Sequence, residues 1–510
     1  MTQPIPVPDT PVQSRTRSSV VYVAVFAASL LLSLFAYLQR DIINSDGILY
    51  VKVARAFVDG GFADAFAVFN WPFFGMLIGF THQLTLLSYE SSAYLLNALF
   101  IAIAVTAFVA CYERTGREGT RPWLAGALIL SLPIINDYRD FIVRDFGYLA
   151  FLFLALWFFL RFSQQHRMRD ALLWQLALGL AAAFRIEALV FALVPTLYYV
   201  GSHPPEMSRR LLHSNAVFLG AVVLGVVVYL LRGATGDVGA NLFTLQQWLS
   251  YASPAKIWSG IDREAATLHQ QLQYLSSHRD AVLVLSSGLL ALTTFKLLSN
   301  AVIPFCLTAM YGSHKRWLTG NRGTRITWIF VGLAVAAILA LVASRFFLSS
   351  RYTIAAALLL SLITFAYVDV GLKRLADGGR KRLLLIAWAV IAIMFLDGVI
   401  STGASKRVIR TGSEQALTIA DPQATWLCNE PRIRFYTDER CELVGRTRLL
   451  NLLGGKRADD TPAVLLIWVP RKDGELQEAI EGNPLVEVIE SSANRRGDKL
   501  GVYRLPAGSN

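Results

Sequence analysis

The chain has 510 residues, of which 54% are hydrophobic and only 16% are charged, and its formal net charge is +12. Soluble globular proteins carry about 25% charged residues, so this composition and the long apolar runs predict a polytopic membrane protein. Both features argue against a disordered or fibrous chain. The excess basic charge lies in short loops between apolar runs, which is the pattern that orients a membrane protein rather than one that binds nucleic acid.

Eleven uncharged runs predict membrane spans. They lie near 18–39, 91–112, 122–136, 146–160, 171–184, 188–205, 211–231, 297–314, 326–344, 352–368 and 383–396. Some runs are shorter than the ~20 residues that cross the hydrocarbon, but snorkelling Arg and Lys side chains at their ends extend them. The segment before them, residues 1–17, is rich in Pro, Thr and Gln and is predicted to be disordered. No small-residue cleavage site follows the first run, so we interpret it as a signal anchor.

The connecting loops alternate in charge. One set, which includes the N-terminal segment, holds 19 basic and six acidic residues and therefore has a net charge of +13. The net charge of the rest of the chain is −1. The positive-inside rule puts this set in the cytoplasm. The N-terminus is then cytoplasmic, and the loops 40–90, 137–145, 185–187, 232–296 and 345–351 are extracytoplasmic, together with the tail from about residue 400.

The tail, residues 400–510, has a different composition and predicts a soluble extracytoplasmic domain. Strand-like runs lie at 463–469, 485–489 and 500–505, and a helical stretch lies at 475–481, which predicts a small α/β or α+β domain. Cys428 and Cys441 are disulfide candidates in an oxidising compartment. The expected organisation is therefore a disordered segment (1–17), a helical transmembrane domain (18–399) and this tail (400–510).

The first outer loop is long and carries an acidic residue near its start. Asp46 opens a segment with apolar residues at helical spacing, which predicts an amphipathic helix at the membrane surface. Ser45 and Asp46 stand directly before the helical pattern, as N-cap residues do, so a capping role and a chemical role both stay open for Asp46. A second apolar stretch, residues 69–87, is also expected in the interface.

The order of several motifs resembles the GT-C membrane glycosyltransferases, in particular the protein mannosyltransferase and aminoarabinose transferase branch (family 39-like). The motifs, which fall within residues 20–370, are Asp46 with Tyr50 and Ala54 one and two turns later, Trp71-Pro72, Tyr94-Leu95-Leu96-Asn97, Arg144-Asp145-Phe146-Gly147-Tyr148, Arg185-Ile186-Glu187 and Arg351-Tyr352.

The resemblance implies a GT-C transmembrane catalytic domain in a bacterial inner (plasma) membrane, with about 11 transmembrane helices and a periplasmic C-terminal domain. It implies a polyprenyl-phosphate-linked sugar as donor, hexosyl or pentosyl transfer with inversion, and Asp46 as general base on a glycan, lipid or protein acceptor. Asp145 matches a second acidic position and is expected to orient the acceptor or the base. No cofactor and no metal are expected.

The departing lipid phosphate needs cations near the outer interface, and the Arg fork suits phosphate oxygens. The candidates are Arg345, Arg351, Lys296, Lys52 and Arg55. The competing interpretation is that they anchor their helices in the interface, which the positive-inside rule disfavours for Arg345 and Arg351 because they bracket a short outer turn. By resemblance, Tyr50, Arg185, Glu187 and Tyr352 complete the substrate-binding set; Arg185 and Glu187 can also simply pair.

Three other interpretations stay open. A transporter of lipid or solute should show paired broken helices and repeated halves, which the sequence lacks. An O-antigen ligase or polymerase places its catalytic loop late in the chain, and loop 232–296 is long enough for one. A membrane scaffold that only displays the tail leaves the acidic and basic residues on the outer side without a role.

Overall fold

The computed structural model describes residues 12–115, 120–202, 206–232, 253–272, 274–400, 406–454 and 462–506. The chain divides into two compact units. The first, called the helical unit, comprises Met1–Leu34, Leu96–Arg139 and Arg144–Val399. The second, called the mixed unit, comprises Phe35–Leu95, Asp140–Val143 and Ile400–Asn510. The first outer loop therefore groups with the C-terminal domain, although the sequence assigned it to the transmembrane domain.

Seven helices in the described part of the chain are long and apolar enough to cross a membrane. They are Ser18–Gln39 within α1 (Val12–Gln39), α4 (Tyr89–Thr115), α7 (Asp145–Gln165), α13 (His278–Asn300), α15 (Arg322–Arg345), Ser350–Asp377 (η2, Ser350–Thr353, with α16, Ile354–Asp377) and α17 (Lys381–Val399). Six of them coincide with predicted spans. The fold class, a polytopic helical membrane protein with a small C-terminal sheet domain, is confirmed.

The other five predicted spans form shorter or interrupted helices, or lie partly outside the region whose side chains are described. They correspond to α5 (Pro122–Leu130) with α6 (Pro133–Asn136), α8 (Met168–Phe184), η1 (Ile186–Leu193) with α9 (Val194–Val200), α10 (Met207–Arg232) and α14 (Ile303–His314). Pro133 and Pro195 stand where two of these runs break, since proline cannot donate the next helical hydrogen bond. At the N-terminus, α1 begins at Val12, inside the segment predicted to be disordered; the preceding residues lie outside the described part.

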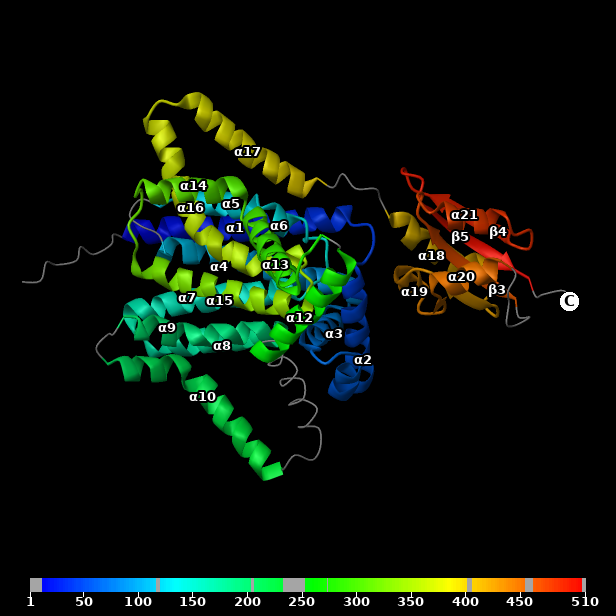
Figure 1. The fold of residues 1–510 in the computed structure, drawn as a ribbon, viewed down its shortest axis with the longest axis horizontal. Helices are drawn as coiled ribbons and strands as arrows, with labels where there is room; N and C mark the ends of the chain where they lie inside the picture. Colours follow the sequence, from blue (N-terminus) through cyan, green and yellow to red (C-terminus); the bar gives the residue numbers. More distant parts are fainter. Residues whose placement is uncertain are drawn as a thin grey trace, which may run out of the picture. The chain divides into compact units, whose positions relative to one another are not determined.

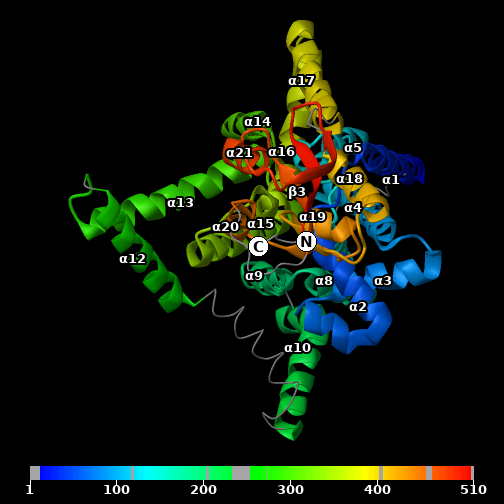
Figure 2. The same ribbon diagram turned by 90° about the vertical axis from the view of Figure 1, so that its right-hand side faces the viewer.

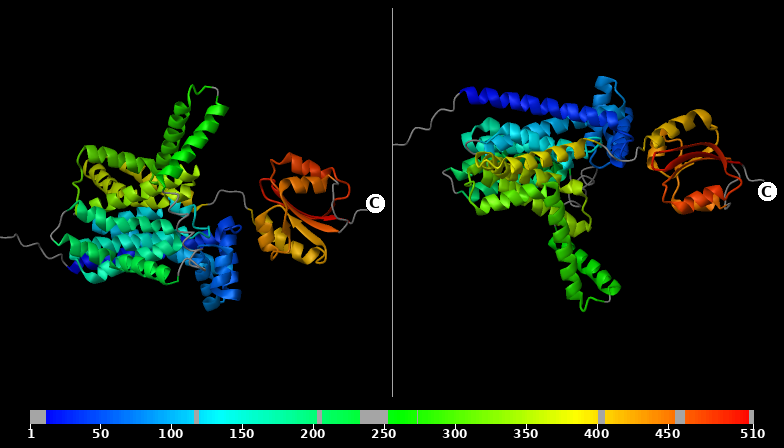
Figure 3. Two further views of the ribbon diagram at one scale, coloured as in Figure 1. Left: turned by 60° about the horizontal axis from the view of Figure 1, so that its bottom comes forward. Right: turned by 90° about the horizontal axis from the view of Figure 1, so that it is seen from above.

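The described residues of the predicted outer loop 232–296 include two helices. They are α12 (Pro254–Gln271) and α13, both labelled in Figure 1. They form a hairpin that projects from the bundle of α7, α8, α15 and α16 (Figures 2 and 3). The sequence analysis left the uncharged run 281–295 in the outer loop, and this run forms most of α13. Only the C-terminal end of α13 reaches η2.

Polar contacts join helix ends on one side of the bundle. Arg161 of α7 lies 3.1 Å from Asp170 of α8, and Arg121 lies 2.6 Å from Asp369 of α16. Arg322 of α15 donates a hydrogen bond of 2.8 Å to the carbonyl oxygen of Ser163. All three arginines belong to the loops predicted to be cytoplasmic, so the charge alternation groups residues that do lie at one end of the helices.

The C-terminal part of the mixed unit is a five-stranded sheet in the order β2-β1-β3-β5-β4. The strands are β1 (Thr425–Cys428), β2 (Glu442–Leu443), β3 (Ala463–Val469), β4 (Glu487–Ala493) and β5 (Lys499–Leu505). β1 pairs in parallel with β2 and β3, while β5 runs antiparallel to β3 and β4. The sequence predicted β3, β4, β5 and α21 (Gly474–Glu481); it missed the short β1 and β2.

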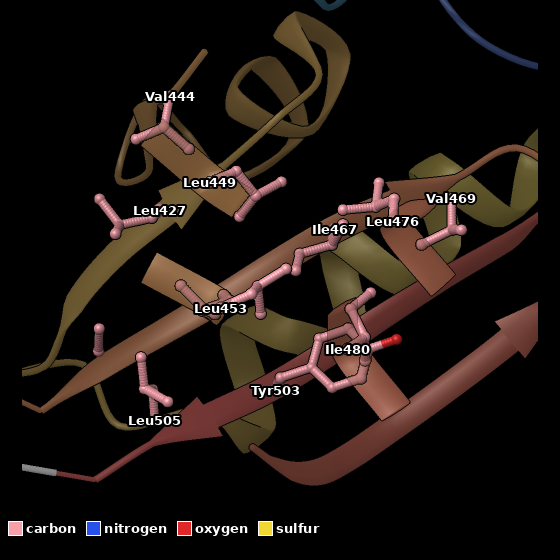
Figure 4. Packing of buried hydrophobic residues seen from close by; sticks show 12 residues of the cluster. Leu427, Val444, Leu449, Leu453, Ile467, Val469, Leu476, Ile480, Tyr503 and Leu505 are labelled. Carbon is pink, nitrogen blue, oxygen red and sulfur yellow. The ribbon is translucent and has the colours of Figure 1, made fainter. Parts of the chain in front are cut away.

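Helices cover both faces of this sheet (Figure 3). Because side chains alternate along a strand, β3 sends Leu465 and Ile467 to one face and Leu466 to the other. The first face packs against α20 (Arg446–Leu453) and α21 (Figure 4), and the second packs against α18 (Arg407–Ile419) and α19 (Pro431–Tyr436).

The first outer loop forms two helices, α2 (Ser45–Val68) and α3 (Phe73–Thr85). They pack on each other through Tyr50, whose ring lies edge-on to Phe74 with 5.1 Å between centroids. Other apolar side chains of this loop stay exposed, among them Phe62 (66%) and Leu84 (72%), as the predicted interfacial placement requires.

Candidate functional site

Acidic and basic side chains from three parts of the helical unit meet at one carboxylate. Asp145 lies in the first turn of α7, and Arg185, directly after α8, donates to its Oδ1. Arg185 also donates to Glu187 Oε1 at 3.0 Å. From η2, Arg351 Nε lies 3.4 Å from Asp145 Oδ2. We call Asp145, Arg185, Glu187, Arg351 and Tyr352 the Arg–Asp cluster.

The cluster is largely buried. Asp145 and Arg185 have side-chain exposures of 6% and 10%, whereas Arg351 reaches 22%. Tyr352 faces Arg185, with 5.0 Å between the guanidinium carbon and the ring centroid, and Tyr148 stands 5.8 Å from it. These residues line a pocket of about 60 Å³, which has room for a few water molecules but not for a hexose. The more exposed Arg351 is thus the guanidinium best placed to meet a ligand.

Close packing of α7 on α8 brings Asp145 and Arg185 together. Gly147 makes it possible, because a Cβ there would lie 2.2 Å from Cε1 of Phe184. The motif around Asp145 therefore includes a glycine for a steric reason and not for backbone freedom.

Helix α13 holds the turn that carries Arg351. Lys296 donates to the carbonyl oxygen of Leu348, and Asn300 Nδ2 donates to Ser350 O at 3.0 Å and to Thr353 Oγ1 at 2.5 Å. Lys296, predicted to bind phosphate, thus has a backbone partner in the structure. Asn300 was not singled out by the sequence, since a lone Asn at the end of an apolar run carries no motif.

Asp46 lies in the first turn of α2 and is partly buried. The residue at the N-cap position is Asn44, so neither Ser45 nor Asp46 occupies it as the sequence pattern had allowed. The Asn44 side chain makes two bonds to the backbone of Ile142: it donates to the carbonyl at 3.1 Å and accepts from the amide at 2.8 Å. An acidic residue in the first turn suits the positive end of the helix dipole.

The other predicted residues of the first loop have partners within the mixed unit. Tyr50 is buried against α3. Lys52 Nζ lies 2.8 Å from Glu439 Oε1. Arg55 lies over the rings of Tyr89 and Phe435, at 5.9 and 5.8 Å. The structure therefore gives Tyr50, Lys52 and Arg55 intramolecular contacts where substrate contacts were expected.

Three further predictions concern other parts of the chain. Arg345 ends α15 and is exposed, and it does not line the pocket of the Arg–Asp cluster. A disulfide bond joins Cys428 and Cys441. Among the described residues, no group of three or more His, Cys, Asp or Glu side chains could hold a metal ion.

The sequence of the membrane part matches a known family. The family described as dolichyl-phosphate-mannose-protein mannosyltransferase matches residues 72–231, a range that includes Asp145, Arg185 and Glu187. This part of the chain is thus similar to a family of membrane glycosyltransferases, in agreement with the resemblance seen in the sequence. The matched range begins after Asp46 and ends before Arg351. No curated protein sequence matches the chain.

The solved structures that resemble this chain include two of oligosaccharyltransferases. One is the archaeal oligosaccharyltransferase AglB from Archaeoglobus fulgidus in complex with an inhibitory peptide and a dolichol-phosphate, with 11% identity and a TM-score of 0.46 over 83% of this chain and 60% of that one. The other is the Archaeoglobus fulgidus oligosaccharyltransferase in complex with Zn and sulfate, with 12% identity and a TM-score of 0.46 over 82% of this chain and 57% of that one. The chain thus spans less than two thirds of the length of these structures.

Proposed function

We propose that the protein transfers a sugar from a polyprenyl-phosphate-linked donor to an acceptor on the extracytoplasmic face of a bacterial inner membrane, with inversion at the anomeric carbon. The observation that carries this proposal is the Arg–Asp cluster, in which Arg351 and Arg185 converge on Asp145 at helix ends predicted to be extracytoplasmic. An ionisable group in a membrane helix bundle is costly unless it is paired or used.

The reaction shifts charge onto the phosphate. The acceptor hydroxyl or amine forms a bond to the anomeric carbon, the bond from that carbon to the phosphate oxygen breaks, and a base takes the acceptor proton. The donor is a phosphodiester with one negative charge, and the departing polyprenyl phosphate is a monoester with a second one. A cation near the phosphate therefore stabilises the transition state more than the bound donor.

We assign the phosphate contact to Arg351. Arg185 is held at two edges by Asp145 and Glu187, so its task is to fix Asp145. Asp145 in turn holds Arg351 at its Nε edge, and a guanidinium held in place loses less entropy when it binds an anion. Asp145 is then a positioning residue, whereas Asp46 is the proposed general base.

The test is transfer by the purified protein in lipid nanodiscs, supplied with a polyprenyl-phosphate hexose or pentose and acceptor-containing envelope extract. We expect Asp46→Asn to lower transfer by roughly 10²–10⁴-fold and Arg351→Gln by about 10²–10³-fold. The control is Arg263→Gln, which removes an arginine of α12 whose side chain is 76% exposed. This variant should transfer the sugar at the wild-type rate. Turnover must release polyprenyl phosphate; substrate movement without release would identify a transporter. Full activity of Asp46→Asn would remove the base assignment.

A further inference from the structure

The residue that leads into the Asp46 helix is bonded on both sides of its backbone by the C-terminal domain. Ile43 is fully buried, and its amide donates to Tyr436 Oη at 2.8 Å. Its carbonyl oxygen accepts from Arg432 Nε at 3.1 Å. A buried backbone amide or carbonyl is costly without a partner, so these two side chains complete the structure of the chain immediately before Asp46.

The same domain also contacts α2 beyond Asp46, through Lys52 and Arg55. Lys52 Nζ pairs with Glu439 at 2.8 Å, and Arg55 lies over the ring of Phe435. Residues three apart lie on one face of a helix, so Lys52 and Arg55 present one face to the domain. Asp46 lies nine positions from Arg55, about 180° around the helix, so these contacts are made by a face of the helix other than the one that carries Asp46.

Four side chains of the C-terminal domain make these contacts: Arg432, Phe435, Tyr436 and Glu439. All four lie in one short segment, residues 429–440, which we call the docking loop. The disulfide between Cys428 and Cys441 joins its two ends. Inside it, α19 carries Arg432, Phe435 and Tyr436. Glu439 and its neighbour Asp438 adopt positive φ, 62° and 50°. Such a backbone is unfavourable for residues other than glycine, and here it turns the chain so that Glu439 meets Lys52.

We infer that the docking loop is a positioning device for catalysis: Tyr436, Arg432 and Glu439 fix the start of α2 and thereby the orientation of the Asp46 carboxylate. The inference deepens the proposed function and rests on it. It gives the C-terminal domain a task in the reaction although none of its residues need touch the sugar. The expected signature is a loss in kcat with little change in KM for the donor, because misplacing a base leaves donor binding intact.

The first measurement needs no substrate. Hydrogen exchange of the 41–56 segment is compared in full-length wild type and Tyr436→Phe, which removes the acceptor of the Ile43 amide. We expect exchange to become roughly tenfold faster there, with exchange of β3 unchanged, which shows that the domain stays folded. Tyr503→Phe is the matched control, since it removes a tyrosine hydroxyl from another part of the same domain. Unchanged exchange at 41–56 would overturn the inference.

The second measurement is turnover of a polyprenyl-phosphate hexose. Tyr436→Phe should lower kcat by about tenfold with KM within about threefold of wild type.

Glu439→Lys should also lower kcat, and the exchanged pair Lys52→Glu with Glu439→Lys should restore it. A kcat for the exchanged pair no higher than that of Glu439→Lys alone would show that the pair of Lys52 and Glu439 does not orient α2, and would count against the inference. If exchange at 41–56 accelerates while kcat stays at the wild-type value, the inference is wrong and the proposed function stands. If Asp46→Asn keeps full turnover, the proposed function fails and the inference falls with it.

Discussion

Arg351 and Asp145 stand far apart in the chain, yet Arg351 Nε lies 3.4 Å from Asp145 Oδ2 while Arg185 binds the other oxygen of the same carboxylate. One buried carboxylate therefore separates and anchors two guanidinium groups. Without it, two like charges would face each other in a medium of low dielectric constant, where their repulsion is strong. This relationship makes Asp145 the residue on which the rest of the cluster depends.

We predict that Asp145→Asn lowers the free energy of unfolding by about 3–5 kcal/mol, because it leaves buried guanidinium charge uncompensated. It should also weaken binding of a polyprenyl phosphate, and its effect should not add to that of Arg351→Gln. Thermal unfolding in detergent and lipid-binding titrations measure the two effects.

The control is Asp170→Asn, which breaks the buried pair with Arg161 on the other side of the bundle. It should lower the stability of the protein but leave lipid binding unchanged. Equal loss of binding in both variants would contradict the assignment.

We predict that Asn300→Ala weakens polyprenyl phosphate binding by about tenfold, because Asn300 ties the turn of Arg351 through Ser350 and Thr353, and each lost bond is worth about 1 kcal/mol. Asn321→Ala is the matched variant, since its amide ties another helix end by donating to Thr115 O at 3.0 Å. Both should lower the melting temperature, but only Asn300→Ala should lower lipid affinity.

We predict that Gly147→Ala destabilises the protein by about 1–3 kcal/mol, because the added methyl group overlaps the ring of Phe184 and pushes α7 from α8. Gly179→Ala in α8 meets no atom within 4 Å and should stabilise the helix by roughly 0.5–1 kcal/mol. Thermal unfolding of the two variants decides the matter; equal stability would show that α7 and α8 are not packed as described.

The pair of Lys52 and Glu439 predicts a pH dependence. The hydrogen bond from Lys52 lowers the pKa of Glu439 below its usual value of 4.5. A lowered carboxyl pKa contributes stability above the unfolded value and loses it as the pH falls through the folded value. Docking should thus be constant from pH 7 to about 5 and weaken in more acid solution. The effect is small, below about 1 kcal/mol, since both side chains are about one third exposed.

Hydrogen exchange of the 41–56 segment across this range measures it. In Glu439→Gln, exchange measured relative to the intrinsic amide rate at each pH should already be faster at neutral pH and should not change further in the same acid range. An identical acid response in wild type and variant would show that another group controls the docking.

The sequence located the acidic and basic residues of the Arg–Asp cluster but not the network they form. Asp145, Arg185, Glu187 and Arg351 were all candidates, because charged residues next to apolar runs are rare and stand out. Their pairing depends on how α7, α8 and η2 approach one another, which no local pattern encodes. The same holds for Lys296: its charge at an outer helix end predicted a phosphate ligand, and the packing of α13 gave it the Leu348 carbonyl.

The docking loop is the clearest case of a feature invisible in the sequence. Tyr436 and Glu439 belong to a polar segment with no motif, and their partners lie in a loop that precedes them by several hundred residues. Only the two flanking cysteines pointed to a constrained segment there, and they gave no indication of what it binds.

The amino-acid sequence alone determined that this is a multi-pass membrane protein with a small C-terminal domain of strands and helices, because the length of an apolar run and the alternation along a strand are local properties of the chain. Tertiary structure decided which helix ends meet, that Asp145 binds two arginines, and that the C-terminal domain contacts the helix that carries Asp46. Those contacts join distant residues, and their energies depend on burial and distance, which exist only once the chain has folded.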